Sequence, residues 1–432
     1  MVALADIDLI LNQLVLRKAI SPFAPEVSDF LVSAISIAAF AIQIILMFML
    51  YRMITKLPLH GRWVNRISLV FGGAHLAIIS LFAFTILQIL LFSYYHTVVP
   101  ALGEQLAYFC AIFLAGLLAA RMLTWFRSSG EITMLLYGLF AVFFAMYMVT
   151  RTFVRTQLLL DLVPVMDPQT FPFISREGVP NFAQFLNIQT ALEILGFLSF
   201  WSATILLLLH YKQKLGKGVV ISVCALPAVP PAIAFVILTL IYATNAVEAN
   251  EAFMKLATLP YLLQSLASGI IFGLPFLLIG LKLKGNALIV KKYLLIAFVG
   301  MVLFHVANYS ALELTIFPPF GFASVSSLSL SAYTLFLGLY LSVAVIAGDV
   351  NLRASIRKIL AEDPKILNRL AEAEVQEQLH HRVKKLLVAA EALEPQREID
   401  KSSIDSLSEE QVRDYISDVM EEIHGLHKKK LE

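Results

Sequence analysis

Three ionisable side chains lie inside apolar segments, where a charge is costly. Arg151 and Arg155 are four residues apart at the end of an apolar run over 132–154, and Glu193 lies near the start of the run over 188–209. Four-residue spacing puts both arginines on one helix face, and consecutive apolar helices are commonly adjacent, so we expect Arg151 to meet Glu193. Two interpretations fit this pattern. One is a structural ion pair, with Arg155 extending to lipid head groups, and the other is an outward-facing site for an anionic or zwitterionic ligand.

A second set of polar residues follows one face of the apolar run over 293–314. His305 and Asn308 are three residues apart, and Glu313 lies near the end of the run. Gln43 and His75 stand in two other apolar runs. Together these side chains could line a central cavity that binds a ligand, or they could form hydrogen bonds between helices. The histidines are scattered over different runs without HExxH spacing, so the sequence predicts no metal site.

The sequence contains none of the common catalytic motifs. A P-loop, a GxGxxG loop and a nucleophile elbow are all missing, so we predict no catalytic residues, no cofactor and no enzymatic activity. Cys110 and Cys224 stand in apolar runs and fit the role of small packing residues. The apolar part of the chain has no basic patch, so we predict no binding to nucleic acid.

The elements that would position these residues are apolar helices. Hydrophobic residues make up 59% of the 432-residue chain, and the mean hydropathy is +0.79, which is too apolar for a soluble domain. Spanning the hydrocarbon core takes about 20 apolar residues. Runs of that length predict an all-α, polytopic transmembrane bundle with about nine spans, near 30–51, 67–92, 105–125, 132–154, 188–209, 219–243, 259–281, 293–314 and 325–347.

The distribution of Lys and Arg predicts the orientation of the chain. Thirteen of these residues fall in the loops on one side of the predicted spans and six on the other. Cytoplasmic loops carry the excess, so we predict a multi-pass protein of the plasma membrane with its N-terminus outside and its C-terminus in the cytoplasm. Residues 1–25 have apolar positions at helical spacing and predict an amphipathic helix at the membrane interface. Residues 26–348 form the predicted transmembrane domain.

Three predicted spans have unusual composition. The sixth contains ALPAVPPAIAF at 225–235, and its three prolines must kink or unwind a helix. The seventh carries Ser265, Gly269 and Gly273 at four-residue spacing, which predicts close packing against a neighbouring helix. The ninth is rich in serine over 324–331, which suits helix packing or a wet vestibule.

Residues 349–432 form a predicted cytoplasmic helical tail. They hold 14 Lys and Arg and 18 Asp and Glu, which is half of all charged residues in the chain. A heptad-like apolar stripe follows 366–393, so the tail is expected to form a coiled coil, a homodimer contact or a surface for a cytoplasmic protein partner. No proline or glycine interrupts 349–363, which predicts one continuous helix across the membrane exit, with Gly348 as the only soft point.

Two stretches of the tail resemble known proteins. Leu379 to Lys384, LHHRVK, resembles the phosphoacceptor box of a class of two-component histidine kinases, which implies His381 as a phosphoacceptor. That class continues the box with two asparagines, and this chain has Lys385 and Leu386 instead, so the resemblance implies an acceptor helix phosphorylated by another protein. The pattern GDVNLRASIRKIL, LAEAEVQEQLHHRV and DVMEEI after many spans resembles a group of uncharacterised polytopic membrane proteins of ammonia-oxidising archaea. That resemblance implies the same architecture, with no site residues.

From these patterns we expect a receptor-like integral membrane protein. An outward-facing site in the helical bundle would be coupled to the cytoplasmic tail, which would engage a partner or self-associate. The alternative is a transporter or channel for a small solute or ion. The broken sixth span and the polar residues inside other spans favour that alternative.

Overall fold

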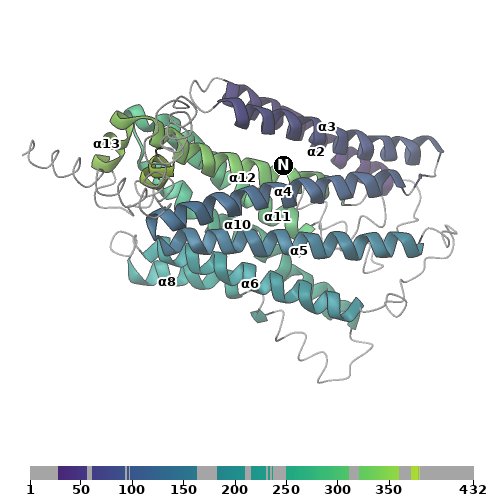
Figure 1. Ribbon diagram of the computed structural model, residues 1–432. Helices are drawn as coiled ribbons and strands as arrows, with labels where there is room; N and C mark the ends of the chain where they lie inside the picture. The colour runs from purple at the N-terminus through teal and green to yellow at the C-terminus, as the bar shows by residue number, and fades with distance from the viewer. Residues whose placement is uncertain are drawn as a thin grey trace, which may run out of the picture.

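The computed structural model describes residues 28–55, 61–92, 95–96, 98–162, 182–209, 216–229, 232–233, 236, 250–310, 321–359, 371–377 and 379. All regular structure within these residues is helical (Figure 1). The predicted interfacial helix at 1–25, Glu313 and His381 lie outside the described residues.

Long α-helices account for most of the described chain, and short 3-10 turns connect or interrupt some of them. The elements are α2 (Ser28–Thr55), α3 (Gly61–Phe92), α4 (Val98–Ser129), α5 (Ile132–Leu162), α6 (Phe182–Leu209), α8 (Lys217–Ala225), η2 (Leu226–Ala228), α10 (Asn250–Lys282), η3 (Gly285–Ala287), α11 (Leu288–Ser310), α12 (Phe322–Gly348) and α13 (Val350–Ile359). Figure 1 shows the long helices running along a common direction, with α13 at one end of the bundle.

Seven helices among the described residues are long and apolar enough to cross a membrane. They lie within α2, α3, α4, α5, α6, α11 and α12, and each matches a predicted span. Large apolar side chains such as Phe48, Leu69 and Phe92 face outward and are mostly exposed, as lipid contact requires. The chain is therefore a multi-pass helical membrane protein. The total of nine spans stays a prediction. Within 219–243, residues 230–231, 234–235 and 237–243 are outside the described residues, and the apolar part of α10 with described side chains, Leu266–Lys282, is shorter than a span.

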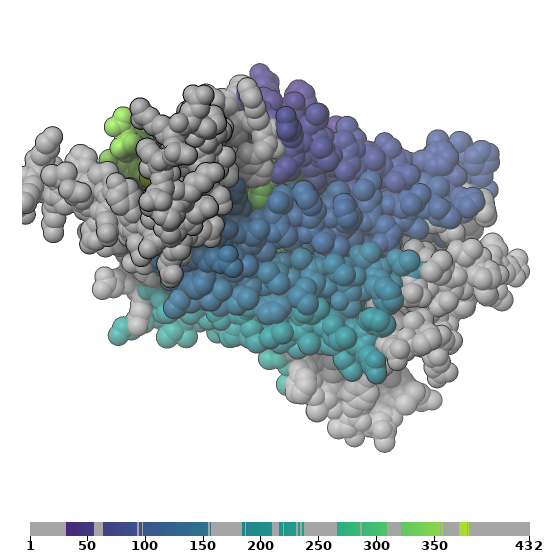
Figure 2. Space-filling model, viewed as in Figure 1, coloured from purple at the N-terminus to yellow at the C-terminus, as the bar shows by residue number. Residues whose placement is uncertain are grey.

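Helix α12 forms the centre of the bundle. Of its most apolar window, 94% is buried, against 33–61% for the other six spanning helices. It packs on α11, α4, α2 and α3. In the space-filling view of Figure 2, the blue and teal surfaces of α4, α5 and α6 cover this centre from the viewer's side. A helix that is buried all round has no polar face to present to water, which agrees with its unbroken apolar and serine composition.

Glycines allow α10, α11 and α12 to approach closely. A Cβ at Gly269 would lie 2.9 Å from the Cα of Val302, and one at Gly300 would lie 2.6 Å from the backbone nitrogen of Leu335. Gly273 packs in the same way on Phe298, 2.6 Å from its ring. The predicted small-residue face of the seventh span is thus confirmed at both glycines, while the side chain of Ser265 is not described. Close backbone contact replaces the hydrophobic driving force that lipid removes.

The first proline of the sixth predicted span interrupts its helix. Helix α8 ends at Ala225, and the chain continues as the 3-10 turn η2 with Pro227 buried inside it. Proline lacks an N–H and clashes with the preceding turn, which explains the change of helix type. The predicted kink or unwinding is seen at this proline only as a change to a tighter 3-10 turn, and Pro230 and Pro231 are outside the described residues.

The predicted continuous helix across the membrane exit is wrong. Helix α12 ends at Gly348, and Asp349 has an extended backbone with φ −127° and ψ 110°. Its Oδ1 accepts a hydrogen bond of 3.0 Å from the backbone N–H of Leu352, so Asp349 caps α13. Aspartate competes for backbone donors better than it continues a helix, and this capping preference outweighs the lack of proline and glycine.

Candidate functional site

Arg151 is buried in the half of the bundle away from α13. Its side chain is 3% exposed, and its Nη1 donates a hydrogen bond of 3.3 Å to the Tyr147 hydroxyl one turn earlier on α5. The guanidinium carbon lies 5.4 Å from the centre of the Tyr108 ring on α4. Hydrogen bonding and contact with aromatic faces are the two means by which a protein keeps a cation inside an apolar environment.

Two carboxyl groups lie within electrostatic range of this arginine. Glu104 on α4 is 4% exposed and accepts a hydrogen bond of 2.9 Å from the Tyr108 hydroxyl. Glu104 and Glu193 on α6 both attract the Arg151 guanidinium. The five side chains Glu104, Tyr108, Tyr147, Arg151 and Glu193 are called the Arg151 cluster below. Arg151 and Glu193 do lie together, and their role in binding a ligand stays a prediction.

The helix geometry explains how three elements contribute to the cluster. Glu104 and Tyr108 are four residues apart on α4, and Tyr147 and Arg151 are four apart on α5, so each pair projects from one face. Glu104 lies just before the predicted run 105–125, and Tyr108 lies inside that run without any feature that marks it as a site residue, so neither is among the predicted site residues. The usable signal was an acid followed four residues later by tyrosine at the mouth of a span.

The other predicted site residues, His305, Asn308 and Arg155, are not among the five members of the Arg151 cluster. His305 is buried among aromatic rings, 5.7 Å from Phe200 and 5.1 Å from Phe272, and its Nδ1 is 3.1 Å from the Met301 carbonyl oxygen. Asn308 lies one turn further along α11 and is partly buried, and its Oδ1 has no partner in the described part of the chain. Arg155 belongs to α5, but its side chain is not described.

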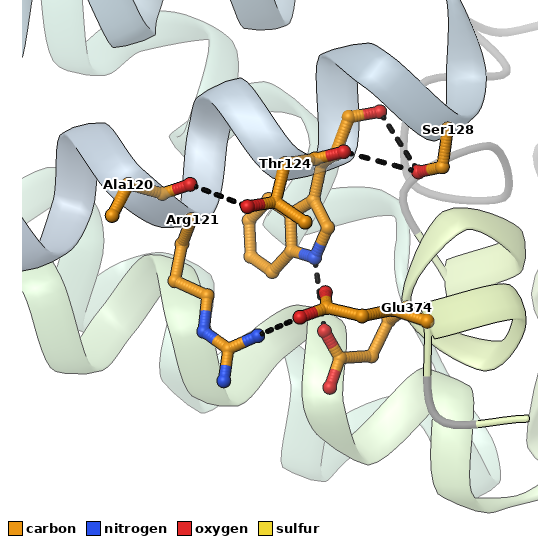
Figure 3. A network of polar contacts seen from close by, with 7 residues as sticks. Ala120, Arg121, Thr124, Ser128 and Glu374 are labelled. Carbon is orange, nitrogen blue, oxygen red and sulfur yellow. Dashed lines mark hydrogen bonds and ion pairs between the residues drawn. The ribbon is translucent and has the colours of Figure 1, made fainter. Parts of the chain in front are cut away.

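A second group of contacts, at the other end of α4, holds part of the tail (Figure 3). The Trp125 indole N–H donates a hydrogen bond of 2.9 Å to Oε2 of Glu374, which is 3% exposed. Arg121 forms an ion pair of 2.7 Å with Glu377. Both α4 side chains lie on the Tyr340 ring of α12, Arg121 at 5.5 Å and Trp125 at 6.5 Å between ring centres. These five residues are called the tail dock.

A small apolar cavity lies beside Trp125. Its volume is about 30 Å³, and α4, α5, α6, α10, α11 and α12 all contribute to its walls. Ligand pockets are usually ten or more times larger, so this cavity has room for about one or two water-sized molecules and is not the ligand site.

Gln43 and His75 form a third polar group, near the start of α12, whereas the tail dock contacts Tyr340 further along that helix. Gln43 on α2 donates from Nε2 to the hydroxyl oxygens of Ser326 at 2.9 Å and Ser327 at 3.2 Å. His75 on α3 has its Nδ1 at 3.2 Å from the Ser329 hydroxyl. These residues are called the serine seam. For Gln43 and His75 the structure shows hydrogen bonding between helices, and for His305, Asn308 and Glu313 the choice between the two interpretations stays a prediction.

No protein-family model, curated protein or solved structure matches this chain. The functional argument therefore depends on the described geometry alone. Of the three polar groups, the Arg151 cluster has the most buried ionisable side chains, Glu104 and Arg151. The tail dock is the contact between the bundle and the polar tail.

Proposed function

We propose that the chain is a receptor-like membrane protein in which a ligand at the Arg151 cluster changes how the tail is held at the tail dock. The observation that supports this proposal is the shared helix α4. Glu104 and Tyr108 belong to the cluster, and Arg121 and Trp125 belong to the dock. Seventeen residues separate Glu104 from Arg121, which is about 26 Å of helix. A shift or rotation of one rigid helix would reach both groups.

The charges of the cluster favour a ligand with a cationic group. The cluster holds one guanidinium and two carboxyl groups, so its acidic groups outnumber its cation. A cationic group of a zwitterion would be attracted to Glu104 and Glu193, and its acidic group would be attracted to Arg151. A free anion would meet two carboxylates, and we therefore prefer the zwitterion over the anion.

The tail is the proposed output of the receptor. Glu374 is buried under the bundle while it is bound to Trp125, so a partner protein or a second tail cannot contact it in this state. Release from the dock would expose the acidic face of this segment. Asp349 separates α12 from α13, so the dock, rather than a continuous helix, is the route by which the bundle controls the tail.

Hydrogen–deuterium exchange of the peptide covering 371–377 tests this coupling in nanodiscs. Glu193→Gln removes an ionisable group from the Arg151 cluster. Glu193 belongs to α6, and none of the five tail-dock residues lies on that helix. We expect several-fold faster exchange in 371–377, because the altered cluster shifts α4. Ser199→Ala on the same helix is the matched control, since that partly exposed hydroxyl donates to the Leu195 carbonyl of its own helix at 2.8 Å. Unchanged exchange in Glu193→Gln, with the fold intact, would contradict the coupling.

Transport of a small solute or ion is the second candidate function. The interruption of α8 at Pro227 favours it, because broken helices bind substrates in many transporters. Flux into liposomes that depends on substrate, and that is lost in Glu193→Gln or His305→Ala, would support transport. Equal flux in protein-free liposomes and proteoliposomes would exclude it for the solutes tested.

A further inference from the structure

The hydrogen bonds of the serine seam fix the orientation of the Gln43 amide. Ser326 donates its hydroxyl proton to the Phe322 carbonyl at 2.7 Å, and Ser327 donates to the Ala323 carbonyl. With these protons committed, both hydroxyl oxygens can only accept. Gln43 must therefore turn its NH₂ toward them and its Oε1 away. Within the described residues, that Oε1 is buried and has no hydrogen-bond partner.

The same reasoning fixes the tautomer of His75. Ser329 donates its hydroxyl proton to the Ser326 carbonyl at 3.0 Å, so its oxygen can only accept from the His75 ring. Nδ1 must then carry the proton, and Nε2 of the neutral ring carries a lone pair. In the part of the chain that the structure describes, Nε2 has no partner, and the whole His75 residue is fully buried.

Both unpartnered acceptors belong to side chains that form hydrogen bonds with the same turn of α12. Gln43 binds Ser326 and His75 binds Ser329, three residues further on, which is a rise of about 4.5 Å. Buried acceptors in membrane helices nearly always have a donor, because neither lipid nor apolar side chains can supply one. A single small molecule with two donor hydrogens would satisfy both acceptors.

We propose that a water molecule binds between α2, α3 and α12 and donates its two hydrogens to Gln43 Oε1 and His75 Nε2. An amide oxygen and a neutral imidazole carry no net charge, so they suit a neutral donor better than a desolvated cation. Ser36 lies seven residues before Gln43 on the same face of α2, and its buried hydroxyl has no partner among the described residues either. It extends the polar surface from the water site toward the start of α2.

Solid-state NMR of the full chain in bilayers, with ¹⁵N-labelled histidine, tests the proposal. His75→Gln assigns the signal by its loss, and Ser329→Ala, which removes the ring's acceptor, assigns it by a shift of Nδ1 if the first variant does not fold. We expect His75 to be the Nδ1-protonated tautomer, with transfer of polarisation from water to Nε2. Gln43→Leu should reduce that transfer at least several-fold. Thr85→Val, a buried change on α3 at a hydroxyl that bonds the Leu81 carbonyl, should leave it unchanged.

Two results would overturn the proposal. One is a proton on Nε2 of His75, or no transfer of polarisation from water to that nitrogen. The second of these counts only if the His96 ring, which is outside the apolar core, does show transfer from water. The other is a shift of the Nε2 signal when sodium or potassium replaces a bulky organic cation, which would assign the site to a metal ion. The measurement does not involve the Arg151 cluster or the tail, so its outcome is separate from that of the proposed receptor function.

Discussion

Arg151 illustrates how a single residue can be both costly and stabilising. Its charge is buried, yet Tyr147 accepts its hydrogen bond, Tyr108 presents its ring, and Glu104 lies within electrostatic range. Removing one partner from such a group destabilises the protein more than replacing the whole group with apolar residues, because the remaining charges stay in a low-dielectric environment. The arginine and its two acids should therefore be considered as one unit.

Arg151→Ala should destabilise the protein by about 3–5 kcal/mol, because it leaves Glu104 and Glu193 without their cation. Arg151→Lys keeps the charge but loses the flat contact with the Tyr108 ring, so its loss should be smaller. Reversible unfolding by denaturant in detergent measures both values. A loss below 1 kcal/mol for Arg151→Ala would mean that the two acids are protonated or are neutralised by other groups.

Trp125→Phe should weaken the tail dock and leave the bundle folded. Phenylalanine keeps a ring on Tyr340 but cannot donate a hydrogen bond, so the buried Glu374 carboxylate loses a partner at a cost of about 1.5–3 kcal/mol. Hydrogen exchange in 371–377 should rise more than tenfold. Trp201→Phe removes an equivalent indole bond, 2.7 Å to the Cys224 carbonyl, and should leave the exchange of 371–377 unchanged.

At the scale of elements, hydropathy identified most of the bundle and periodicity identified some of its contacts. Each of the seven spanning helices in the described residues lies within or close to an apolar run, because about 20 apolar residues have no other stable place. The four-residue spacing of Gly269 and Gly273 located a close helix contact, because small residues on one face have few other uses in a membrane.

The central position of α12 could not be predicted from its sequence. Its serines over 324–331 were compatible with packing or with a wet vestibule, since serine can satisfy its hydroxyl on its own helix and lie in either environment. The tail dock was also missed, because Arg121 and Trp125 read as ordinary residues at the end of a span. Glu104 was missed because one-dimensional patterns do not show which neighbouring helix supplies a partner.

Gly300→Ala should destabilise the contact between α11 and α12. The added methyl group would lie 2.6 Å from the backbone nitrogen of Leu335, and backbone cannot move aside cheaply, so we expect a loss of about 1–3 kcal/mol. Gly116→Ala on α4 is the control, because nothing lies within 4 Å of the new Cβ. That change should be neutral or stabilise by about 0.5–1 kcal/mol. Equal effects in thermal unfolding would contradict the packing argument.

For the whole molecule, the proposed coupling predicts that body and tail act together. Affinity capture after cross-linking in native membranes compares the full chain with a chain ending at Gly348. We expect a cytoplasmic protein, or a second copy of the tail, to be captured only with the full chain, and to be captured more strongly from Trp125→Phe, in which the tail is released. Identical captures from both chain lengths would limit the tail to an assembly role and leave transport as the better proposal.

The burial of α12 also has a consequence for biogenesis. This helix emerges from the ribosome after α2, α3, α4 and α11, yet it lies among all four in the finished bundle. Synthesis proceeds at about 5–20 residues per second, so α2, α3 and α4 are in the membrane for about 10 seconds or more before α12 exists, whereas α11 directly precedes it. During that time the face of α2 that carries Gln43 has no α12 to contact. We therefore expect α2, α3 and α4 to be held through their contacts with one another until α12 arrives and completes the bundle.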